Sequence, residues 1–472
     1  MIPVTLAQVV ADCNAISAGE IPPEIAGEQI SSLTVDTRTV SAGAVFAAIK
    51  GARVNGSELA GAALSAGARA VITAEPAVAV DSGADPARVI AVDDVETAIG
   101  ALARANLERV RRTGNPDLKV VAVTGSVGKT TVKDLLAALL EERGPIIAPP
   151  GSFNNELGLP ITVLRADVDT ATLVLEMGAD HVGNIDYLTS IAAPDAAAVL
   201  IVARAHLGEF GGIDNVALAK SELVRGTREG GTVVLNADDP RVADMARFAR
   251  GPVIAFSASG SGDVAARDVE VGPDGRASFT LVTPSGEAAV KLKLVGEHHV
   301  ANALAAAAIA HSLGIATPRI ASTLSAIGPA SPHRMDVFDT DGVTVIDDSY
   351  NANPDSMRAG LTALERLGQG RRKIAVLGEM LELGEASAAE HEAIGVFAAS
   401  VGVEHLVTMG GEAQPLAAAA SGEGLTVAEA AGPEGALTAL TAILAPGDVV
   451  LLKGSHGSGV WKVADSMREE SK

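Results

Sequence analysis

The chain has 472 residues, which is too long for one hydrophobic core and predicts roughly three domains of ordinary size. Apolar residues make up 48% of it and aromatic residues only 2%, which is typical of an α/β protein with a core of Ala, Val, Leu and Ile. The net charge of −22 opposes binding to nucleic acid or an anionic membrane surface, and no apolar run is long enough to span a membrane.

Cysteine content and the N-terminal sequence bear on the compartment. Cys13 is the one cysteine, which excludes an intramolecular disulfide and a metal site built on two cysteines. The start, MIPVTLAQVVADCN, lacks the basic segment and cleavage site of a signal peptide. We expect a cytoplasmic enzyme that is monomeric.

The first segment, residues 1–97, alternates helix and strand patterns and predicts a small α/β domain. Its stretch VDTRTVSAGAVFAAIKG carries Asp36, Thr37, Arg38 and Lys50 among turn-like glycines. The pattern alone favours a solvated domain edge for these side chains. A helical run, ETAIGALARANLERVRR, and the turn TGNPD then lead into a second domain, predicted for residues 98–328.

Residues 119–142, KVVAVTGSVGKTTVKDLLAALLEE, change from an apolar strand pattern to a glycine turn and then to a helical pattern. Gly125 and Gly128 allow a tight turn with inward N–H groups, Lys129 adds a charge, and Thr130 adds a hydroxyl for Mg²⁺. The structural alternative is a chance turn that opens a helix. The pattern predicts a nucleotide-phosphate site made of Thr124, Gly125, Ser126, Val127, Gly128, Lys129, Thr130 and Thr131.

Two polar side chains follow the next strand patterns. Glu176 closes the run TLVLE, and His206 follows the run AAAVLIVARA. Open parallel sheets bind ligands at the carboxyl ends of their strands, so Glu176 is a candidate Mg²⁺ ligand beside Thr130, with a salt bridge as the alternative. His206 suits a metal or phosphate contact, and a structural role is equally compatible with the pattern.

Lys220 lies on a predicted helix, in NVALAKSELVRG. The pattern alone favours a solvent-exposed lysine paired with Glu222 or Asp214. If the amine were buried by the site, its pKa would fall, and a neutral lysine can act as a nucleophile or add CO₂ to form a carbamate that binds Mg²⁺.

The end of the second domain contains a strand hairpin, GPDGRASFTLVTPSGEAAVKLKL, followed by the helical run after GEHH. Asn302 lies one helical turn past His298, and its amide can both donate to and accept from an adenine edge. The alternative is a polar group on the helix surface. The turn-rich segment IGPASP, residues 327–332, then marks the linker to the third domain.

The third domain, predicted for residues 329–472, is expected to be a doubly wound, Rossmann-like parallel sheet. Its apolar runs VTVIDDSY, RKIAVLGE, EHLVTMG and DVVLLKG are separated by helical segments. Asp347 and Asp348 are adjacent at a strand end, so we expect one to face the ligand and the other solvent. Arg334 and Lys453 are the cations that can meet phosphate or carboxylate there.

These motifs together resemble the Mur ligases of peptidoglycan synthesis, which are ATP-dependent amide-bond-forming enzymes. The resemblance rests on TGSVGKTT, EMGADH, AHLGEFGG, ALAKSE, GEHHVANALAA and the late acidic loop, which occur in the family's order over essentially the whole chain. Within the family, IDDSYNANPDSM, VLGEMLELGE and SFNNELGLP look like the members that join D-alanyl-D-alanine to UDP-N-acetylmuramoyl-tripeptide. His299 and His456 depart from the family pattern, which has asparagine and arginine there.

The resemblance also implies roles for individual residues. It implies that Lys129, Lys220 and His206 are catalytic, with Lys220 carbamylated, and that two Mg²⁺ ions are bound. The implied metal ligands are Thr130, Glu176, His206 and Lys220. Asn302, Arg334 and Asp348 join the phosphate loop in binding ATP. The implied substrate-binding residues are Asp36, Thr37, Arg38, Asn154, Asn155, Asn351, Asn353 and Lys453.

Several functions stay open on the sequence alone. Other Mur ligases add single amino acids, and folylpolyglutamate-type ligases share the phosphate loop and the carbamate lysine but use folate and glutamate. From a different class, the chain could be a P-loop kinase or nucleotide switch, or a nucleotide-gated assembly protein. A reaction that needs the amine of the dipeptide distinguishes the ligase from these classes.

Overall fold

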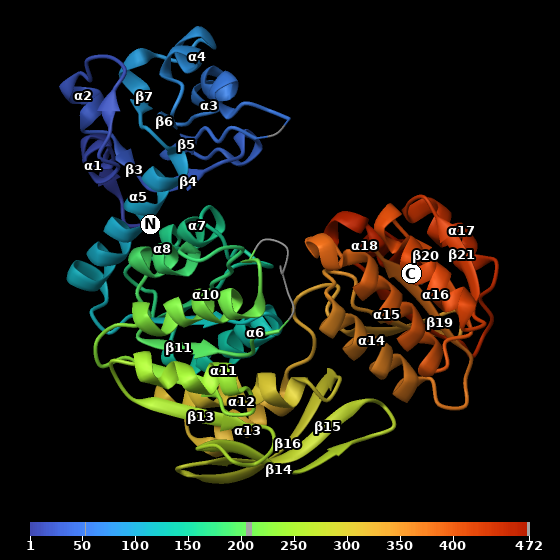
Figure 1. Ribbon diagram of the computed structural model, residues 1–472. Coiled ribbons are helices and arrows are strands. Elements are labelled where there is room, and N and C mark those ends of the chain that lie inside the picture. The colour runs from blue at the N-terminus through green and yellow to red at the C-terminus, as the bar shows by residue number, and fades with distance from the viewer. Residues whose placement is uncertain (52, 204–209, 470–472) are drawn as a thin grey trace.

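The computed structural model describes residues 1–51, 53–203 and 210–469. These residues form three α/β units in chain order, and each unit is built on its own sheet. The N-terminal and C-terminal units lie on different sides of the middle unit (Figure 1). No helix among the described residues combines the length and apolar character that crossing a membrane requires.

The N-terminal unit contains a five-stranded sheet in the order β2-β7-β6-β5-β4, with β1 paired to β3 beside it. Strands β4 to β7 run parallel, and their buried side chains pack against short helices. The elements are β1 (Val4–Thr5), α1 (Leu6–Asp12), β2 (Ile16–Ser17), α2 (Pro23–Ala26), β3 (Gln29–Ile30), β4 (Ser32–Thr34), η1 (Thr37–Thr39), β5 (Ala44–Ala47), η2 (Gly56–Leu59), α3 (Ala60–Ser65), β6 (Ala70–Thr73), α4 (Pro76–Asp81), η3 (Pro86–Arg88) and β7 (Val89–Ala91).

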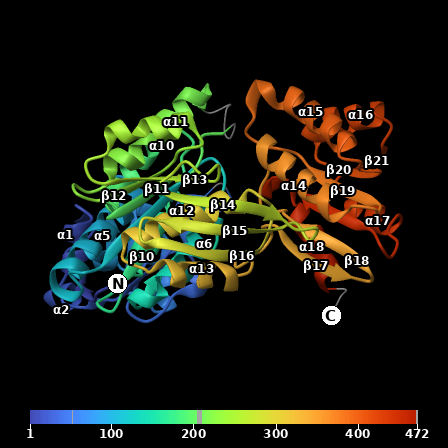
Figure 2. The same cartoon turned by 90° about the horizontal axis from the view of Figure 1, so that it is seen from below.

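The middle unit is a sheet of nine described strands in the order β16-β15-β14-β13-β12-β11-β8-β10-β9. The strands from β9 to β14 are parallel, whereas β14, β15 and β16 form an antiparallel edge. That edge runs toward the C-terminal unit when the molecule is seen from below (Figure 2). The strands are β8 (Lys119–Thr124), β9 (Ile146–Ile147), β10 (Thr172–Glu176), β11 (Ala196–Val199), β12 (Thr232–Asn236), β13 (Val253–Ser257), β14 (Val264–Val271), β15 (Arg276–Thr283) and β16 (Gly286–Val295).

Two helix layers cover the middle sheet. Val120 and Ala122 of β8 belong to one core cluster, and Val121 and Val123 belong to the other, because successive side chains of a strand point to opposite faces. The first cluster involves α5 (Val95–Arg109), α7 (Gly158–Leu164), α8 (Asn184–Ile191) and α10 (Ile213–Gly226). The second involves α6 (Lys129–Leu140), α12 (His299–Ser312) and α13 (Thr317–Ala326). Shorter elements are η4 (Val110–Gly114), η5 (Glu141–Arg143), α11 (Pro240–Ala243) and η6 (Asp244–Phe248).

β8 lies at the point where the strand order of the middle sheet reverses. β8 lies between β10 and β11, so the chain leaves β10 on one side of β8 and enters β11 on the other. Such a switch in strand order opens a crevice at the carboxyl ends of the strands. The turn after β8 therefore lies where a ligand can reach it.

The C-terminal unit is a sheet in the order β17-β18-β22-β19-β20-β21, in which β17 is antiparallel and the other strands are parallel. Helices cover both faces. The elements are β17 (Asp336–Thr340), β18 (Val343–Asp347), α14 (Pro354–Leu367), β19 (Lys373–Gly378), η7 (Gly384–Ala386), α15 (Ser387–Ser400), β20 (His405–Met409), η8 (Gly411–Ala413), α16 (Gln414–Gly422), β21 (Thr426–Ala430), α17 (Pro433–Thr441), β22 (Val449–Lys453), η9 (His456–Ser458) and α18 (Val460–Glu469).

The predicted fold class, three α/β domains with a doubly wound C-terminal sheet, is confirmed. The predicted domain boundaries stay predictions. The first of them, between residues 97 and 98, falls in the first turn of α5. β17 and β21 were absent from the sequence prediction, and β21 has no fully buried residue, so its sequence gives a weak strand signal.

Candidate active site

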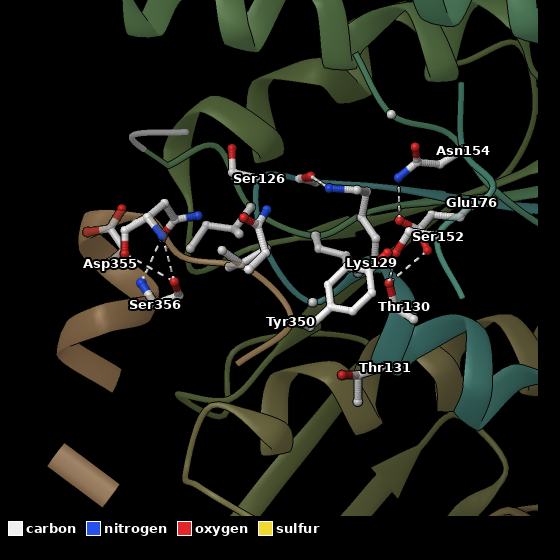
Figure 3. Close-up of a pocket in the computed structure, with 18 of the residues that line it drawn as sticks. Ser126, Lys129, Thr130, Thr131, Ser152, Asn154, Glu176, Tyr350, Asp355 and Ser356 are labelled. Atoms are coloured by element: carbon white, nitrogen blue, oxygen red, sulfur yellow. Dashed lines mark hydrogen bonds between the residues drawn. The ribbon is translucent and has the colours of Figure 1, made fainter. Parts of the chain in front are cut away.

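A cavity of about 710 Å³ lies between the middle and C-terminal units. The turn after β8, the segment around Ser152, and the end of β10 line it from the middle unit. The loop after β18 and the start of α14 line it from the other side. Figure 3 shows these two groups of side chains, with Lys129 and Thr130 on α6 and with Asp355 and Ser356 on α14.

The turn after β8 has the geometry of a phosphate loop. Gly128 has a φ of 87° and immediately precedes the first residue of α6, so the N-terminus of this helix faces the cavity. A Cβ atom at Gly128 would lie 2.4 Å from Oδ1 of Asn302, which leaves room for no other residue type. Lys129 donates from Nζ to the carbonyl of Gly125 at 2.9 Å, so the ammonium is folded back over the loop. The loop can therefore bind an anion with backbone N–H groups and with one ammonium.

Thr130 and Glu176 meet at the edge of this loop. The hydroxyl of Thr130 donates to Oε2 of Glu176 at 2.9 Å, and Nδ2 of Asn154 donates to Oε1 at 2.7 Å (Figure 3). Thr130 also lies 3.0 Å from the hydroxyl of Ser152. Glu176 is only 1% exposed, and among the described residues it is held by hydrogen bonds and not by a salt bridge. One carboxylate and one hydroxyl beside a phosphate site are the oxygen ligands that suit Mg²⁺, so these residues fit that ion.

Lys220 is buried, with 3% exposure, and lines the same cavity. Burial, with a smaller contribution from the charge of Lys129, lowers the pKa of Lys220 to about 7. The predicted surface pairing is wrong for both partners. Glu222 accepts hydrogen bonds from the N–H groups of Gly183 and Asp186 at the start of α8, and Asp214 pairs with Arg241.

Asn302 and two histidines close the cavity beside the phosphate loop. Asn302 is buried on α12 and is not a polar group of the helix surface, and its Nδ2 lies 3.2 Å from Nδ1 of His299. The rings of His298 and His299 lie 4.1 Å apart, and Nε2 of His299 is buried without a hydrogen-bond partner among the described residues. Burial lowers the pKa of both histidines, so the two imidazoles are neutral near pH 7.

The C-terminal unit presents Asp348 and Lys453. Nζ of Lys453 donates to Oδ2 of Asp348 at 2.5 Å and to the carbonyl of Asn351 at 3.0 Å. Asp347 was expected to face solvent if Asp348 faced the ligand, and this expectation is wrong. Asp347 is fully buried and accepts hydrogen bonds from Nδ1 of His333 and from Ser349. It therefore fixes His333, directly after the interdomain linker, and does not line the cavity.

Arg334 bridges the two sides of the cavity. Its Nη2 donates to the hydroxyl of Ser152 in the middle unit at 3.0 Å, and its guanidinium lies 4.0 Å above the ring of Tyr350. The ring of Tyr350 lies 5.5 Å from that of His456, which stacks on Trp461 at 5.6 Å with an interplanar angle of 7°. Arg334, Tyr350 and His456 thus line the C-terminal side of the cavity, and Trp461 stacks on His456.

Family models match this chain in three consecutive segments. The model of the catalytic domain of the Mur ligase family matches residues 29–107, that of the Mur ligase middle domain matches 123–310, and that of the glutamate ligase domain matches 333–456. A UDP-N-acetylmuramoyl-tripeptide--D-alanyl-D-alanine ligase of Mycobacterium tuberculosis is 42% identical, over 99% of this chain and 98% of that protein. This chain belongs to the Mur ligase family.

Other relatives agree with the family assignment. The ligase of the same description from Escherichia coli is 34% identical to this Mur ligase over 80% of the chain and 82% of that protein. A crystal structure of MurF from Acinetobacter baumannii superposes with a TM-score of 0.87, at 32% identity and 99% coverage of both chains. MurF from Thermotoga maritima in complex with ADP superposes with a TM-score of 0.78, at 29% identity, over 93% of this chain and 97% of that one.

The structure brings most of the predicted site residues of this Mur ligase together. Gly125 to Thr131, Asn154, Asn155, Glu176, Lys220, Asn302, Arg334, Asp348, Asn351, Asn353 and Lys453 all line the cavity. Thr124 lies buried at the end of β8 and outside that lining. His206 lies outside the described residues. Asp36, Thr37 and Arg38 are in the N-terminal unit, where Arg38 forms an exposed ion pair with Asp36 at 2.6 Å.

Two predicted asparagines of this Mur ligase also have local structural contacts. Oδ1 of Asn353 accepts from the N–H of Ser356 at 2.8 Å and caps α14, which leaves the amide nitrogen available. Oδ1 of Asn155 accepts from the N–H of Gly158 at the start of α7. The sequence prediction missed Ser152, Tyr350 and His298 as cavity residues. Ser152 and Tyr350 lie within the recognised motifs SFNNELGLP and IDDSYNANPDSM, but only the fold shows which residues of a motif line the cavity.

Proposed function

We propose that this chain joins D-alanyl-D-alanine to UDP-N-acetylmuramoyl-tripeptide with conversion of ATP to ADP and phosphate. The observation that carries the proposal is one cavity in which a phosphate loop and a buried carboxylate face cationic groups of the C-terminal unit. Its ligase relatives with 42% and 34% identity carry this activity in their names. We further propose a cytoplasmic, monomeric enzyme.

The proposed reaction has two steps. The terminal carboxylate of the tripeptide attacks the γ-phosphorus of ATP, which breaks the bond to ADP and forms an acyl phosphate. The free amine of D-alanyl-D-alanine then attacks the acyl carbon, and the tetrahedral intermediate expels phosphate and leaves an amide. Phosphoryl transfer of this kind depends on positioning and on neutralising negative charge.

The chain's own groups fit the first step. The N–H groups of the loop around Gly128 and the ammonium of Lys129 would bind the β- and γ-phosphates, because they are the positive groups at the helix start. Arg334 would meet the transferring phosphoryl group from the C-terminal side. When bound by Thr130 and Glu176, Mg²⁺ would supply further positive charge to the phosphate oxygens.

Lys220 is proposed to carry a carbamate. A carbamate requires a neutral amine, and a pKa of about 7 leaves about half of this amine neutral at pH 7. The added carboxylate would give the cavity a further acidic group besides Glu176, which lies at the edge of the phosphate loop. A second Mg²⁺, with His206 as a further ligand, completes the proposal.

The remaining residues are assigned by position. Asn302 is proposed to contact adenine beside the phosphate loop, and Asp348 is proposed to contact the ribose. Asn154, Asn155, Asn351, Asn353 and Lys453 are proposed to bind the peptide substrates at the cavity. Asp36, Thr37 and Arg38 are proposed to bind the UDP end, because they lie in the separate N-terminal unit, to which a long substrate would have to extend.

One experiment tests the reaction and its intermediate together. The protein is incubated with ATP, D-alanyl-D-alanine and UDP-N-acetylmuramoyl-tripeptide labelled with ¹⁸O in its terminal carboxylate, and the products are weighed by mass spectrometry. We expect an amide product and one ¹⁸O atom in the released phosphate, because the attacking carboxylate oxygen stays on phosphorus. Phosphate release without the dipeptide, at an equal rate, would instead indicate a nucleotide switch. Product from folate and glutamate would indicate the other ligase class.

A further inference from the structure

Lys133 and Asp134 lie on α6 one helical turn beyond the phosphate loop, and the proposed mechanism uses neither of them. Lys133 is 3% exposed. A buried ammonium is costly unless it is paired and hydrogen-bonded, and this one is both. Nζ lies 2.7 Å from Oδ1 of Asp134, 3.0 Å from the carbonyl of Pro149 and 3.4 Å from the carbonyl of Gly151.

The contacts of Lys133 hold the segment that leads into the cavity. Residues 149–151 directly precede Ser152, which lies 3.0 Å from the hydroxyl of Thr130. Two residues later, Asn154 donates to Glu176. Lys133 therefore fixes the base of a segment whose tip contacts the carboxylate and the hydroxyl beside the phosphate loop.

The contacts of Asp134 hold the linker between the middle and C-terminal units. Its Oδ2 accepts a hydrogen bond of 2.6 Å from the hydroxyl of Ser331. Three residues further on, Arg334 donates to Ser152 at 3.0 Å. The two chains of contacts thus start from neighbouring residues of α6 and meet again at Ser152.

We propose that the Lys133–Asp134 pair positions the peptide-acceptor side of the site and couples it to the interdomain linker. The pair does not line the cavity, so both are positioning residues that act through Ser152, Asn154 and Arg334. The inference deepens the proposed function and rests on it, since the acceptor is the tripeptide carboxylate. Removing the pair should displace residues 149–154, which contact Thr130 and Glu176, and leave the phosphate loop in place.

The central test compares Lys133→Met with the wild-type protein. Methionine keeps the length of the buried stem and removes the charge and the donors. We expect kcat/KM for UDP-N-acetylmuramoyl-tripeptide to fall about tenfold or more, because hydrogen bonds from a charged group are lost at the segment's base. The Kd for ADP without Mg²⁺, measured by calorimetry, should change less than about threefold, because the loop from Gly125 to Lys129 makes none of these contacts. Lys293→Met, on the exposed side of β16, is the matched control and should change neither value.

Two milder variants keep the test decisive if Lys133→Met fails to fold. Asp134→Asn keeps an acceptor for Ser331 but removes the charge that neutralises Lys133, and Ser331→Ala removes only the linker contact. In both variants kcat/KM for UDP-N-acetylmuramoyl-tripeptide should fall, by less than in Lys133→Met, while the Kd for the nucleotide stays nearly constant. Lys133→Arg keeps the charge, so its kcat/KM should lie between those of Lys133→Met and the wild-type protein. Equal changes in the binding of both ligands, or no change for the peptide, would overturn the inference.

A catalysis-independent measurement separates this inference from the proposed function. Hydrogen exchange of the backbone amides in residues 148–155 should be faster in Asp134→Asn and Lys133→Met than in the wild-type protein. If the wild-type protein makes no amide product, the proposed function fails. Unchanged exchange in this segment contradicts the positioning role whatever the reaction is.

Discussion

Gly128 illustrates how one position can combine backbone and packing requirements. It starts α6 with a left-handed φ of 87°, and Oδ1 of Asn302 occupies the space that a side chain would need. Gly183 starts α8 with a φ of 106°, yet a Cβ atom there would meet nothing within 4 Å. A substitution at either glycine would therefore strain the backbone, but only a substitution at Gly128 would also place a side chain against Asn302 at the phosphate loop.

We predict that Gly128→Ala weakens Mg-ADP binding by about tenfold or more, because the loop must shift to relieve the contact with Asn302. Gly183→Ala should lower the free energy of unfolding by about 1 kcal/mol and leave nucleotide affinity unchanged. Calorimetric titration with Mg-ADP and urea unfolding of both variants check this. Equal nucleotide affinities for the two variants would contradict the prediction.

Lys220 gives a second prediction at the residue scale. Lys220→Met keeps the buried volume and removes the amine, so we expect the protein to fold and to bind Mg-ADP while its ligase rate falls at least about a hundredfold. In the wild-type protein, ¹³CO₂ should produce a carbamate signal in the ¹³C NMR spectrum that Lys220→Met lacks. A wild-type signal that persists in the variant would assign the carbamate to another lysine.

For single residues, the sequence predicted which side chains could take part in the chemistry, but it did not predict which other residues surround them. The phosphate loop could be predicted because its glycines, lysine and threonine lie within a few positions of one chain segment. The burial of Lys220 could not, because the side chains that surround it come from distant strands and helices. Which of Asp347 and Asp348 is buried and which lines the cavity depends in the same way on distant residues, because Asp347 contacts His333 and Asp348 contacts Lys453.

At the scale of elements, the end of the interdomain linker is fixed by a pair between His333 and the buried Asp347. His333 has a left-handed φ of 60°, its Nδ1 lies 2.9 Å from Oδ2 of Asp347, and its Nε2 lies 3.6 Å from Asp465. Arg468 and Trp461 also face this imidazole from α18. The hydrogen bond to Asp347 is the largest cause that raises the pKa of His333 above its ordinary value.

This raised pKa gives the linker a pH dependence. The imidazolium pair contributes its full stability below the ordinary histidine pKa and loses it as the pH rises through the folded-state pKa. His333→Asn, which tolerates the left-handed φ, should therefore be less stable than the wild type by about 1 to 2 kcal/mol near pH 5.5, and the difference should shrink near pH 9. Urea unfolding at the two pH values measures this. A stability difference that grows with pH would show that the ion pair is not its source.

The elements themselves followed their sequence patterns where the patterns were strong. The strand pattern and the helical pattern predicted within residues 119–142 correspond to β8 and α6. Val132, Leu135, Leu136 and Leu139 are buried on one face of α6, because apolar residues at this spacing fall on one side of a helix. β15 alternates buried and partly buried residues, as a strand with one covered face must. β21 escaped prediction, since its place at the sheet edge demands few apolar residues.

At the scale of the whole molecule, two arginines connect the middle and C-terminal units with different consequences. Arg334 donates to Ser152 inside the cavity, whereas Arg366 pairs with Glu297 at 2.7 Å on the surface. The exposed pair contributes at most about 1 kcal/mol, because water and salt screen it.

We predict that Arg334→Gln lowers kcat/KM about tenfold or more, since it removes a charge beside the proposed position of the transferring phosphoryl group. Arg366→Gln should change kcat/KM less than about threefold and the free energy of unfolding by less than about 1 kcal/mol. Steady-state kinetics of the two variants at the same ionic strength provides the comparison. A larger loss for Arg366→Gln would indicate that the relative placement of the units depends on the surface pair.

The sequence indicated the middle and C-terminal sheets only as separate units, and not their placement on two sides of one cavity. Periodicity indicates which segments fold on their own sheet, but it contains no information on how two sheets face one another. The meeting of Arg334 with Ser152 across 182 positions of sequence is therefore a property of the folded molecule.

The stacking of Trp461 on His456 makes the protein its own optical reporter. Trp461 is the chain's one tryptophan, and the imidazole that it covers lines the cavity. Its fluorescence therefore comes from a single place, next to a residue that lines the cavity, and it can follow ligand arrival or domain closure in real time without an attached dye.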